Sequence, residues 1–321
     1  MIAIYLYKHF LLTYASVAMR SILKISLIHI NIIALVLALL FSCERDDEIR
    51  IPFGYDPEFN YLTVLRSSPA YAYEQSYGYP ELTYQDPADE RLVELKSTYK
   101  LDSIAGLGDE LDRILNLFNW VHNVVSHDGG NSSPDPENSI NILSYCNESG
   151  EGVNCVYMAI VLNEVYLSLG IKSRVIQGNC KKFIFNGDWH AFNIVYSNTL
   201  GKWIFLDPMK RAFYTDEYGH ILSVAEIRER LIGGKTLELN SDADYNGNPF
   251  DKDEYLNYLS KNMYRFSCSV ESKFGNYGIF HLTNVNRIYV HLDPDGDKQD
   301  GLGVATNYFT SNPDYFWSAP E

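Results

Sequence analysis

The sequence predicts an α+β fold in which a helix that begins at a cysteine packs on an antiparallel sheet. Apolar or small residues at helical spacing predict the helix, and they are Ala159, Leu162, Tyr166 and Leu169. Two strand-like runs, 189–197 and 202–207, predict the sheet, because each places alternate side chains on one face. The turn-forming segment 198–201 between them favours a β-hairpin. Residues 174–178 read as a further strand after the helix.

The predicted helix begins at Cys155. Gly150, Gly152 and Asn154 interrupt regular structure just before it, and Asn154 is a suitable N-cap. Gly170 gives a C-terminal stop, since glycine adopts the left-handed conformation without a Cβ clash. Cys155 therefore falls in the first turn, where free backbone N–H groups and the helix dipole favour the thiolate, the nucleophilic form of cysteine.

The hairpin brings an imidazole and a carboxylate together. His190 lies on the first strand and Asp207 ends the second, so they are opposite or diagonal neighbours within side-chain reach. A base beside a thiol withdraws its proton, and a carboxylate on the base's far nitrogen fixes the tautomer. The backbone N–H of Cys155 is a candidate oxyanion donor. Trp120 is a candidate for the second donor, with a core aromatic as the alternative.

Four motifs carry a resemblance to a known family. They are Gly152-Val-Asn-Cys155, Gly170-Ile-Lys-Ser-Arg174-Val, Trp189-His190-Ala-Phe-Asn and Trp203-Ile-Phe-Leu-Asp207-Pro208. Together they resemble the bacterial transglutaminase-like superfamily over residues 107–214. That family has a papain-like α+β fold and includes transglutaminases, cysteine peptidases, peptide:N-glycanase relatives and members that have lost catalysis. The resemblance implies that Cys155 is the nucleophile, His190 the base and Asp207 the orienting acid.

The resemblance implies a thiol enzyme that acts on peptide or carboxamide C–N bonds through an acyl-enzyme. We favour hydrolysis over cross-linking, and a peptide, protein or glycopeptide as substrate. The chemistry requires no cofactor and no metal. The alternative is a non-catalytic glycan- or peptide-binding module of the cell envelope, on which the same three residues persist as scaffold.

The N-terminus resembles a bacterial lipoprotein signal. Arg20 and Lys24 precede the apolar run 25–41, and Cys43 follows it where cleavage and lipidation are expected. We expect 1–42 to be the signal, with Met19 as a possible start, and the globular part to be anchored in the bacterial envelope, at the outer membrane or cell surface. A transmembrane anchor is the alternative, because the run approaches spanning length.

The remaining chain divides into a tether with an irregular segment (43–85), a transglutaminase-like core (86–215) and a C-terminal α/β extension (216–321). Helices are expected over 89–100, 109–125, 224–231 and 255–266, and strands near Phe280, over 288–292 and over 304–309. The extension either adds strands to the sheet or forms an annex, and Phe316-Trp317 is expected to pin the C-terminal tail to the body.

Composition limits the partners. The net charge is −15 and no basic stripe is present, which argues against nucleic acid. The 25 tyrosines suit a peptide- or carbohydrate-binding surface, although aromatic core composition explains them as well.

Several further residues are secondary candidates. Cys146, Cys180 and Cys268 allow one disulfide at most, and their spacing does not select the pair. His122 and His127 follow Trp120 closely, and His127-Asp128-Gly129 either lines the cleft or is solvated at a helix end. The loop Asp242-x-Asp244-x-Asn246-Gly247, with Asp253 twelfth, mimics a calcium loop, as does the acidic segment 291–301. A capped turn is favoured for the first loop and a solvated β-turn for the second.

Overall fold

The computed structural model describes residues 50–73, 78–131, 136–182, 188–276, 287–297 and 307–321. The chain divides into two units, Met1–Arg50 and Ile51–Glu321, and only Arg50 of the first is described. The predicted signal, Cys43 and the alternative anchor at 25–41 therefore lie outside the described residues. Among the helices that the structure describes, none has the length and apolar character needed to cross a bilayer.

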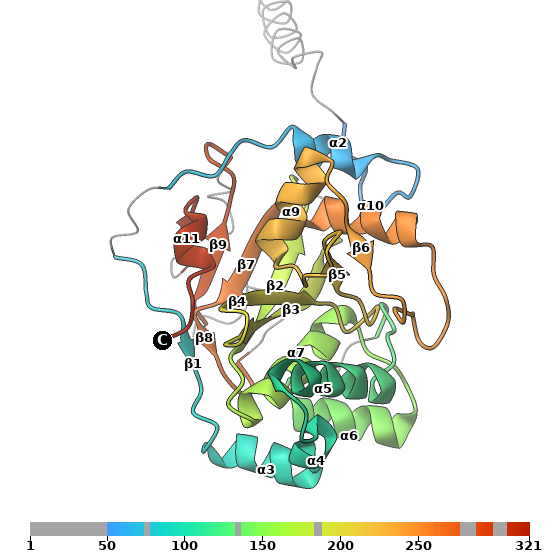
Figure 1. Cartoon of the computed structure of the whole chain (residues 1–321), viewed down its shortest axis with the longest axis vertical. Coiled ribbons are helices and arrows are strands. Elements are labelled where there is room, and N and C mark those ends of the chain that lie inside the picture. Colours follow the sequence, from blue (N-terminus) through green and yellow to red (C-terminus); the bar gives the residue numbers. More distant parts are fainter. Residues whose placement is uncertain (1–49, 74–77, 132–135, 183–187, 277–286, 298–306) are drawn as a thin grey trace, which may run out of the picture. The chain divides into compact units, whose positions relative to one another are not determined.

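A six-stranded sheet forms the centre of the second unit (Figure 1). Its order is β10-β9-β7-β2-β3-β4, and all neighbours are antiparallel except β9 and β10, which are parallel. The strands are β2 (Ser173–Asn179), β3 (His190–Ser197), β4 (Lys202–Leu206), β7 (Arg265–Ser269), β9 (Tyr289–Leu292) and β10 (Tyr308–Thr310). The predicted α+β class and the predicted hairpin, β3–β4, are both confirmed.

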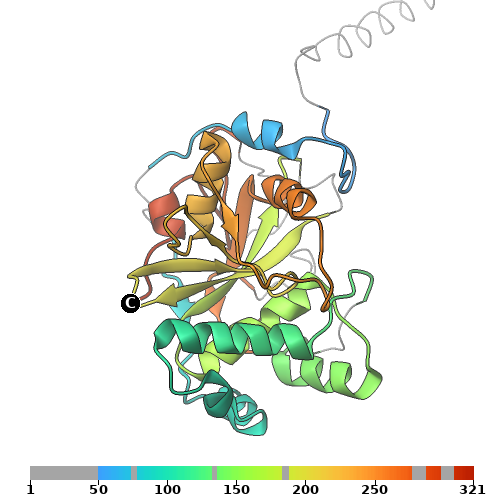
Figure 2. The same ribbon diagram turned by 45° about the vertical axis from the view of Figure 1, so that its right-hand side comes forward.

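One face of the sheet is covered by α7 (Cys155–Ser168), which packs on β2 and β3. A second layer of helices then covers α7 (Figure 2). It consists of α3 (Glu90–Thr98), α4 (Leu101–Ala105), α5 (Glu110–Val124) and α6 (Ser139–Ser149). Because α7 lies between two layers, every side chain from Val156 to Ser168 is buried, and not only the predicted apolar face.

The opposite face carries elements from both ends of the unit. They are α2 (Tyr61–Arg66), α9 (Val224–Gly233) and α10 (Lys252–Asn262), with α11 (Pro313–Phe316) near β9. Two short pairs complete the unit: β1 (Thr83–Tyr84) with β8 (Glu271–Ser272), and β5 (Tyr214–Thr215) with β6 (Glu238–Leu239). The C-terminal tail is pinned as predicted, since Phe316 is fully buried and its carbonyl accepts a 2.9 Å hydrogen bond from Nη1 of Arg174.

The extension adds strands to the main sheet, which is the first of the two predicted alternatives. The helix predicted over 255–266 ends at Asn262, and Arg265 begins β7, which pairs with β2. The segment expected to be irregular contains α2, whose Tyr61 and Leu65 are buried. The strand expected near Phe280 lies outside the described residues, as does the start of the one expected over 304–309.

Candidate active site

Cys155 is the first residue of α7, as predicted. Oδ1 of Asn154 accepts hydrogen bonds from the N–H groups of Val156 at 3.1 Å and Tyr157 at 3.4 Å, which caps the helix. The N–H groups that are left in this turn favour negative charge nearby. Cys155 is half-buried and lines a cavity.

His190 and Asp207 meet on the face of the sheet opposite α7. The pairing of Asn193 with Leu206 places Asp207 across from Phe192, so His190 is its diagonal neighbour. The distance from His190 Nε2 to Asp207 Oδ2 is 2.6 Å, and both side chains are fully buried. This leaves Nδ1 of His190, which is buried and has no hydrogen-bond partner within the described part of the chain.

Asp207 is held by two further donors. The N–H of Met209 donates to Oδ1 at 2.9 Å, and the hydroxyl of Tyr255 donates to Oδ2 at 2.7 Å. Burial works against ionisation of this carboxyl, but the charge and hydrogen bond of His190, with the bonds from Tyr255 and Met209, lower its pKa below the usual range. Asp207 is therefore a fixed negative charge at the far nitrogen of His190.

The thiol and the imidazole have opposite pKa shifts. Burial works against ionisation of Cys155, but the neighbouring imidazoles of His127 and His190 outweigh it and lower the thiol pKa. Burial alone would lower the pKa of His190, and the nearby carboxylate of Asp207 raises it well above its usual value instead. These directions favour a thiolate–imidazolium pair. Within the described residues, no hydrogen bond joins Nδ1 of His190 to the thiol of Cys155.

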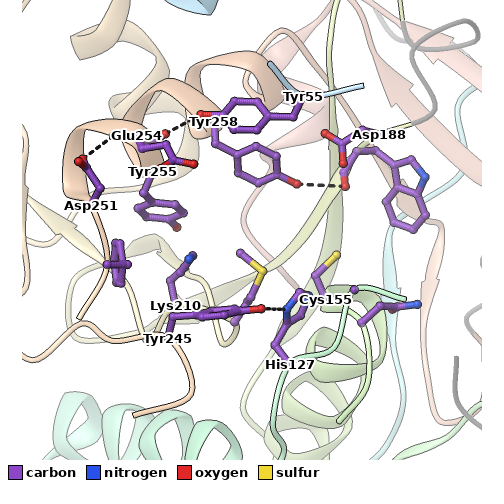
Figure 3. Close-up of a pocket in the computed structure, with 15 residues that line it drawn as sticks. Tyr55, His127, Cys155, Asp188, Lys210, Tyr245, Asp251, Glu254, Tyr255 and Tyr258 are labelled. Carbon is purple, nitrogen blue, oxygen red and sulfur yellow. Dashed lines mark hydrogen bonds between the residues drawn. The ribbon is translucent and has the colours of Figure 1, made fainter. Parts of the chain in front are cut away.

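The cavity at Cys155 has a volume of about 430 Å³. Figure 3 shows its walls, which combine aromatic rings with side chains of both charges. The aromatic residues are Tyr55, Trp189, Tyr245, Phe250, Tyr255 and Tyr258, and the charged ones are Asp188, Lys210, Asp251 and Glu254. Nζ of Lys210 lies 4.0 Å from the ring centroid of Tyr245, and burial lowers the pKa of this lysine. Such a surface suits a polar chain with aromatic or apolar groups, such as a peptide.

His127 also lines the cavity and lies next to Cys155 (Figure 3). Of the two alternatives for His127, the structure therefore confirms that it lines the cleft. His122 is buried, with Nδ1 2.8 Å from the carbonyl oxygen of Pro208 and Nε2 2.9 Å from Oδ1 of Asp244.

Trp120 does not line the cavity. Its ring lies 5.8 Å from that of Tyr99 and packs against the hydrophobic core, so the oxyanion role considered for it does not fit this position and the core alternative does.

The first acidic loop is used for internal contacts. The carboxylate of Asp244 binds His122, Arg211 at 2.7 Å and the N–H of Gly247. Within the described ranges, no group of three or more His, Cys, Asp or Glu side chains is arranged to hold a metal. Part of the second acidic segment, from residue 298 on, lies outside those ranges.

The four cysteines in the described part of the chain, Cys146, Cys155, Cys180 and Cys268, are all free. The disulfide that the sequence allowed is therefore not formed among Cys146, Cys180 and Cys268. These three are buried, and burial raises the pKa of each thiol. Cys155 is set apart from them by its lowered pKa.

Several side chains of the site come from the extension and were not identified from the sequence. Tyr255 and Tyr258 lie on α10, and Tyr245 lies in the first acidic loop. Their only sequence signal is the high tyrosine content, which does not distinguish one tyrosine from another.

One part of the chain is similar to a known protein family. Residues 98–208 match the family model described as the transglutaminase-like superfamily. This part of the chain is therefore a transglutaminase-like domain, and the mixed sheet with its helices has the papain-like α+β fold of that superfamily. No curated protein sequence matches the chain.

Two solved structures illustrate the range of similar proteins. A protein of Cytophaga hutchinsonii, described as a candidate cysteine protease, is 16% identical over 54% of this chain, with a TM-score of 0.27. Red sea bream transglutaminase is 15% identical over 64% of this chain, with a TM-score of 0.30. The chain spans 64% of the first protein and 38% of the second, less than two thirds of either.

Proposed function

We propose that this protein is a thiol enzyme that cleaves peptide or carboxamide C–N bonds. The observation that carries the proposal is the placement of His190, paired with the buried Asp207, beside Cys155 at the start of α7 in a ligand-sized cavity. Thiol, base and orienting acid in this order constitute the arrangement that nucleophilic catalysis requires. In this proposal Cys155 is the nucleophile, His190 the acid–base group and Asp207 the orienting acid.

The reaction proceeds in two halves. The Cys155 thiolate attacks the carbonyl carbon, and the proton on Nδ1 of His190 passes to the leaving amine as the C–N bond breaks and a thioester remains. Water then attacks the thioester while His190 accepts its proton, and the product acid leaves as the thiol is restored. The backbone N–H of Cys155 is the proposed oxyanion donor.

Hydrolysis is the outcome we favour. Transfer to an amine requires that water be kept from the thioester. Cys155 is partly exposed in a cavity whose lining includes several charged side chains, so water has access to the acyl group. A peptide, protein or glycopeptide is the proposed substrate, since the aromatic and charged walls match its mixed surface.

The alternative is a binding module without catalysis, which would hold a glycan or peptide on the same aromatic walls. Six aromatic side chains line the cavity, and aromatic faces bind sugar rings as well as apolar side chains. The two functions differ in the state of the thiol, because only catalysis requires it to be ionised near neutral pH.

The test is the pH dependence of Cys155 alkylation by iodoacetamide, located by peptide mass spectrometry. Enzyme function predicts an apparent pKa below the usual 8.5 or so that returns towards it in His190→Ala. Cys180 and Cys268 are controls within the same chain, since their buried thiols should stay unlabelled at neutral pH. An ordinary pKa at Cys155, unchanged in His190→Ala, would leave the binding module as the better account.

We also propose that Cys43 is lipidated and anchors the protein in the bacterial envelope, with the described part outside the cytoplasm. The support is the sequence alone, an apolar run that ends at this cysteine. Metabolic labelling with an alkyne fatty acid should mark the wild type but not Cys43→Ala. Equal labelling of the two would contradict the assignment, and an unlabelled band of unprocessed length would favour a transmembrane anchor.

A further inference from the structure

His127 is held beside Cys155 by backbone pairing. His127 and Val153 form a parallel bridge, in which the N–H of Asp128 donates to the carbonyl of Val153 at 2.8 Å. The N–H of Val153 donates to the carbonyl of Ser126 at 2.9 Å. Since Val153 is two residues before Cys155, this pairing sets the imidazole of His127 next to the thiol (Figure 3).

Asn246, from the first acidic loop, clamps the backbone of His127. Its Oδ1 accepts from the N–H of His127 at 2.8 Å, and its Nδ2 donates to the carbonyl at 2.9 Å. Asn246 has a φ of +50°, a left-handed conformation that asparagine tolerates better than most residues. The loop that resembles a calcium site therefore has a different use here, which is to fix His127.

Tyr245, the preceding residue, binds the ring itself. Its hydroxyl lies 2.8 Å from Nδ1 of His127 (Figure 3). Burial raises the pKa of Tyr245, so the phenol keeps its proton near neutral pH and is able to donate it. When Nδ1 accepts this bond, the ring proton is on Nε2, which is then the nitrogen able to donate.

We propose that His127 is a second catalytic histidine, whose Nε2–H donates to the sulfur of Cys155 while Tyr245 and Asn246 position its ring and backbone. The inference rests on the proposed function, because it assigns a role in forming the same thiolate. His190 exchanges its proton with the substrate, whereas His127 keeps its proton throughout. In this proposal the thiolate has a charged partner, His190, and a neutral partner, His127. Tyr245 of the extension fixes the tautomer of His127.

Other ionisable groups also act on this thiol and have to be kept constant in a test. His190 approaches from β3 and Tyr258 from α10, while Asp207 acts through His190. Lys210 and Asp188 line the same cavity. None of these is changed by a substitution at His127 or Tyr245, so a difference in thiol ionisation reports on His127.

The first experiment measures the Cys155 alkylation profile in two variants of the full chain. His127→Leu removes the donor and should raise the apparent thiol pKa by about one to two pH units, the expected effect of losing one hydrogen bond to a charged group. His127→Gln retains an N–H donor and should recover part of that change. Equal profiles for the wild type and His127→Leu would overturn the proposal.

The second experiment observes the tautomer in the unaltered protein, so it does not depend on the folding of a variant. Nitrogen-15 NMR of histidine-labelled protein near pH 7 should show His127 protonated on Nε2 and unprotonated on Nδ1. Tyr245→Phe should increase the population protonated on Nδ1, and Tyr218→Phe, an exposed tyrosine away from the cavity, should not. A proton on Nδ1 of His127 in the wild type would overturn the proposal.

The outcomes separate this inference from the proposed function. A lowered wild-type pKa that depends on His190 but not on His127 leaves the enzyme proposal intact and rejects the second histidine. An ordinary wild-type pKa rejects both. A lowered pKa that rises in His127→Leu and in His190→Ala, and rises furthest in the double variant, supports both.

Discussion

The hydroxyl of Tyr255 donates a 2.7 Å hydrogen bond to Oδ2 of Asp207, the same oxygen that binds Nε2 of His190. Tyr255 is on α10, in the extension, whereas Asp207 directly follows β4 in the transglutaminase-like domain. Both side chains are buried, so the contact is shielded from water. The extension thus contributes to the environment of the proposed triad, and this makes its role testable by single substitutions.

Tyr255→Phe should reduce both stability and thiol reactivity. The variant leaves Oδ2 of Asp207 with one donor fewer, and loss of a hydrogen bond to a buried charge costs about 1.5 to 3 kcal/mol in the free energy of unfolding. The pKa of Asp207 should rise, because the lost bond is one of those that lower it. Urea unfolding gives the first effect, and the iodoacetamide reaction of Cys155 gives the second.

The control for this prediction is Tyr214→Phe. Tyr214 is buried and stacks on Tyr255, with ring centroids 6.4 Å apart, but it does not bind Asp207. It should have the smaller effect on Cys155 reactivity. Equal reactivity in the two variants would mean that the hydrogen bond to Asp207 does not tune the site.

Asp207→Asn should narrow the pH range over which Cys155 is a reactive thiolate. In the wild type the thiol pKa is lowered and the His190 pKa is raised, so the thiolate–imidazolium pair forms above the first and persists up to the second. Without the carboxylate, the His190 pKa falls and the thiol pKa rises, which narrows this window from both sides. We expect the rate of substrate turnover to fall by roughly 10²- to 10⁴-fold.

The measurement is the alkylation rate of Cys155 from pH 4 to 10, which requires no known substrate. Asp102→Asn is the control, because Asp102 is an exposed residue on α4 away from the cavity. A window in Asp207→Asn as wide as in the wild type would show that the buried pair of His190 and Asp207 does not govern the thiol.

The part of the site that lies close together in sequence could be predicted from the sequence. Helix start signals located Cys155, and the two-residue period of a hairpin brought His190 and Asp207 into reach. Both arguments need only local backbone geometry. The same rules located the strands β2, β3 and β4 and predicted the pairing of β3 with β4, but not the pairing of β2 with β3 and β7.

The contributions of Tyr245, Asn246 and Tyr255 could not be predicted in this way. Each reaches its partner across 48 to 119 residues, and such contacts have no period in the sequence. The acidic pattern around Asp244 even suggested a different chemistry, because the same residue types serve as calcium ligands and as ion-pair partners. Only the packed fold distinguishes these uses.

Glu164 on α7 should make the protein less stable as pH rises. It is fully buried, and its Oε2 accepts from the N–H and hydroxyl of Ser139 at 2.7 and 2.6 Å. Burial raises its pKa from 4.5 to about 7, and the hydrogen bonds only partly offset this. Between these two values the folded state keeps a proton that the unfolded state releases, so stability falls by about 1.4 kcal/mol per pH unit there.

Glu164→Gln should remove this component of the pH dependence. The free energy of unfolding, measured in urea at pH 5 and pH 8, should differ less in Glu164→Gln than in the wild type, by up to about 3 kcal/mol. Glu148→Gln alters an exposed carboxyl on α6 and is the control. If Glu164→Gln keeps the wild-type difference between the two pH values, Glu164 is ionised in the folded protein.

Gly152→Ala should displace His127 without touching any side chain of the site. A Cβ on Gly152 would lie 2.7 Å from the carbonyl oxygen of Ser126 and 3.1 Å from backbone atoms of His127 and Asp128. These are backbone atoms, so the strand-like segment 126–128 has to move, and overpacking of this kind costs about 1 to 3 kcal/mol. Alkylation of Cys155 at neutral pH should slow in parallel.

The matched control for this last prediction is Gly233→Ala, at the end of α9. A Cβ on Gly233 would meet only the flexible side chain of Lys235, at 3.9 Å, so a methyl group fits, and alanine is preferred over glycine in a helix. Gly233→Ala should therefore be neutral or slightly stabilising and leave Cys155 unaffected. Because Gly152 bears no side chain, slower alkylation in Gly152→Ala alone would trace thiol reactivity to the position of residues 126–128. If Gly152→Ala is destabilised but its alkylation rate is unchanged, the pairing of His127 with Val153 does not influence the reactivity of Cys155.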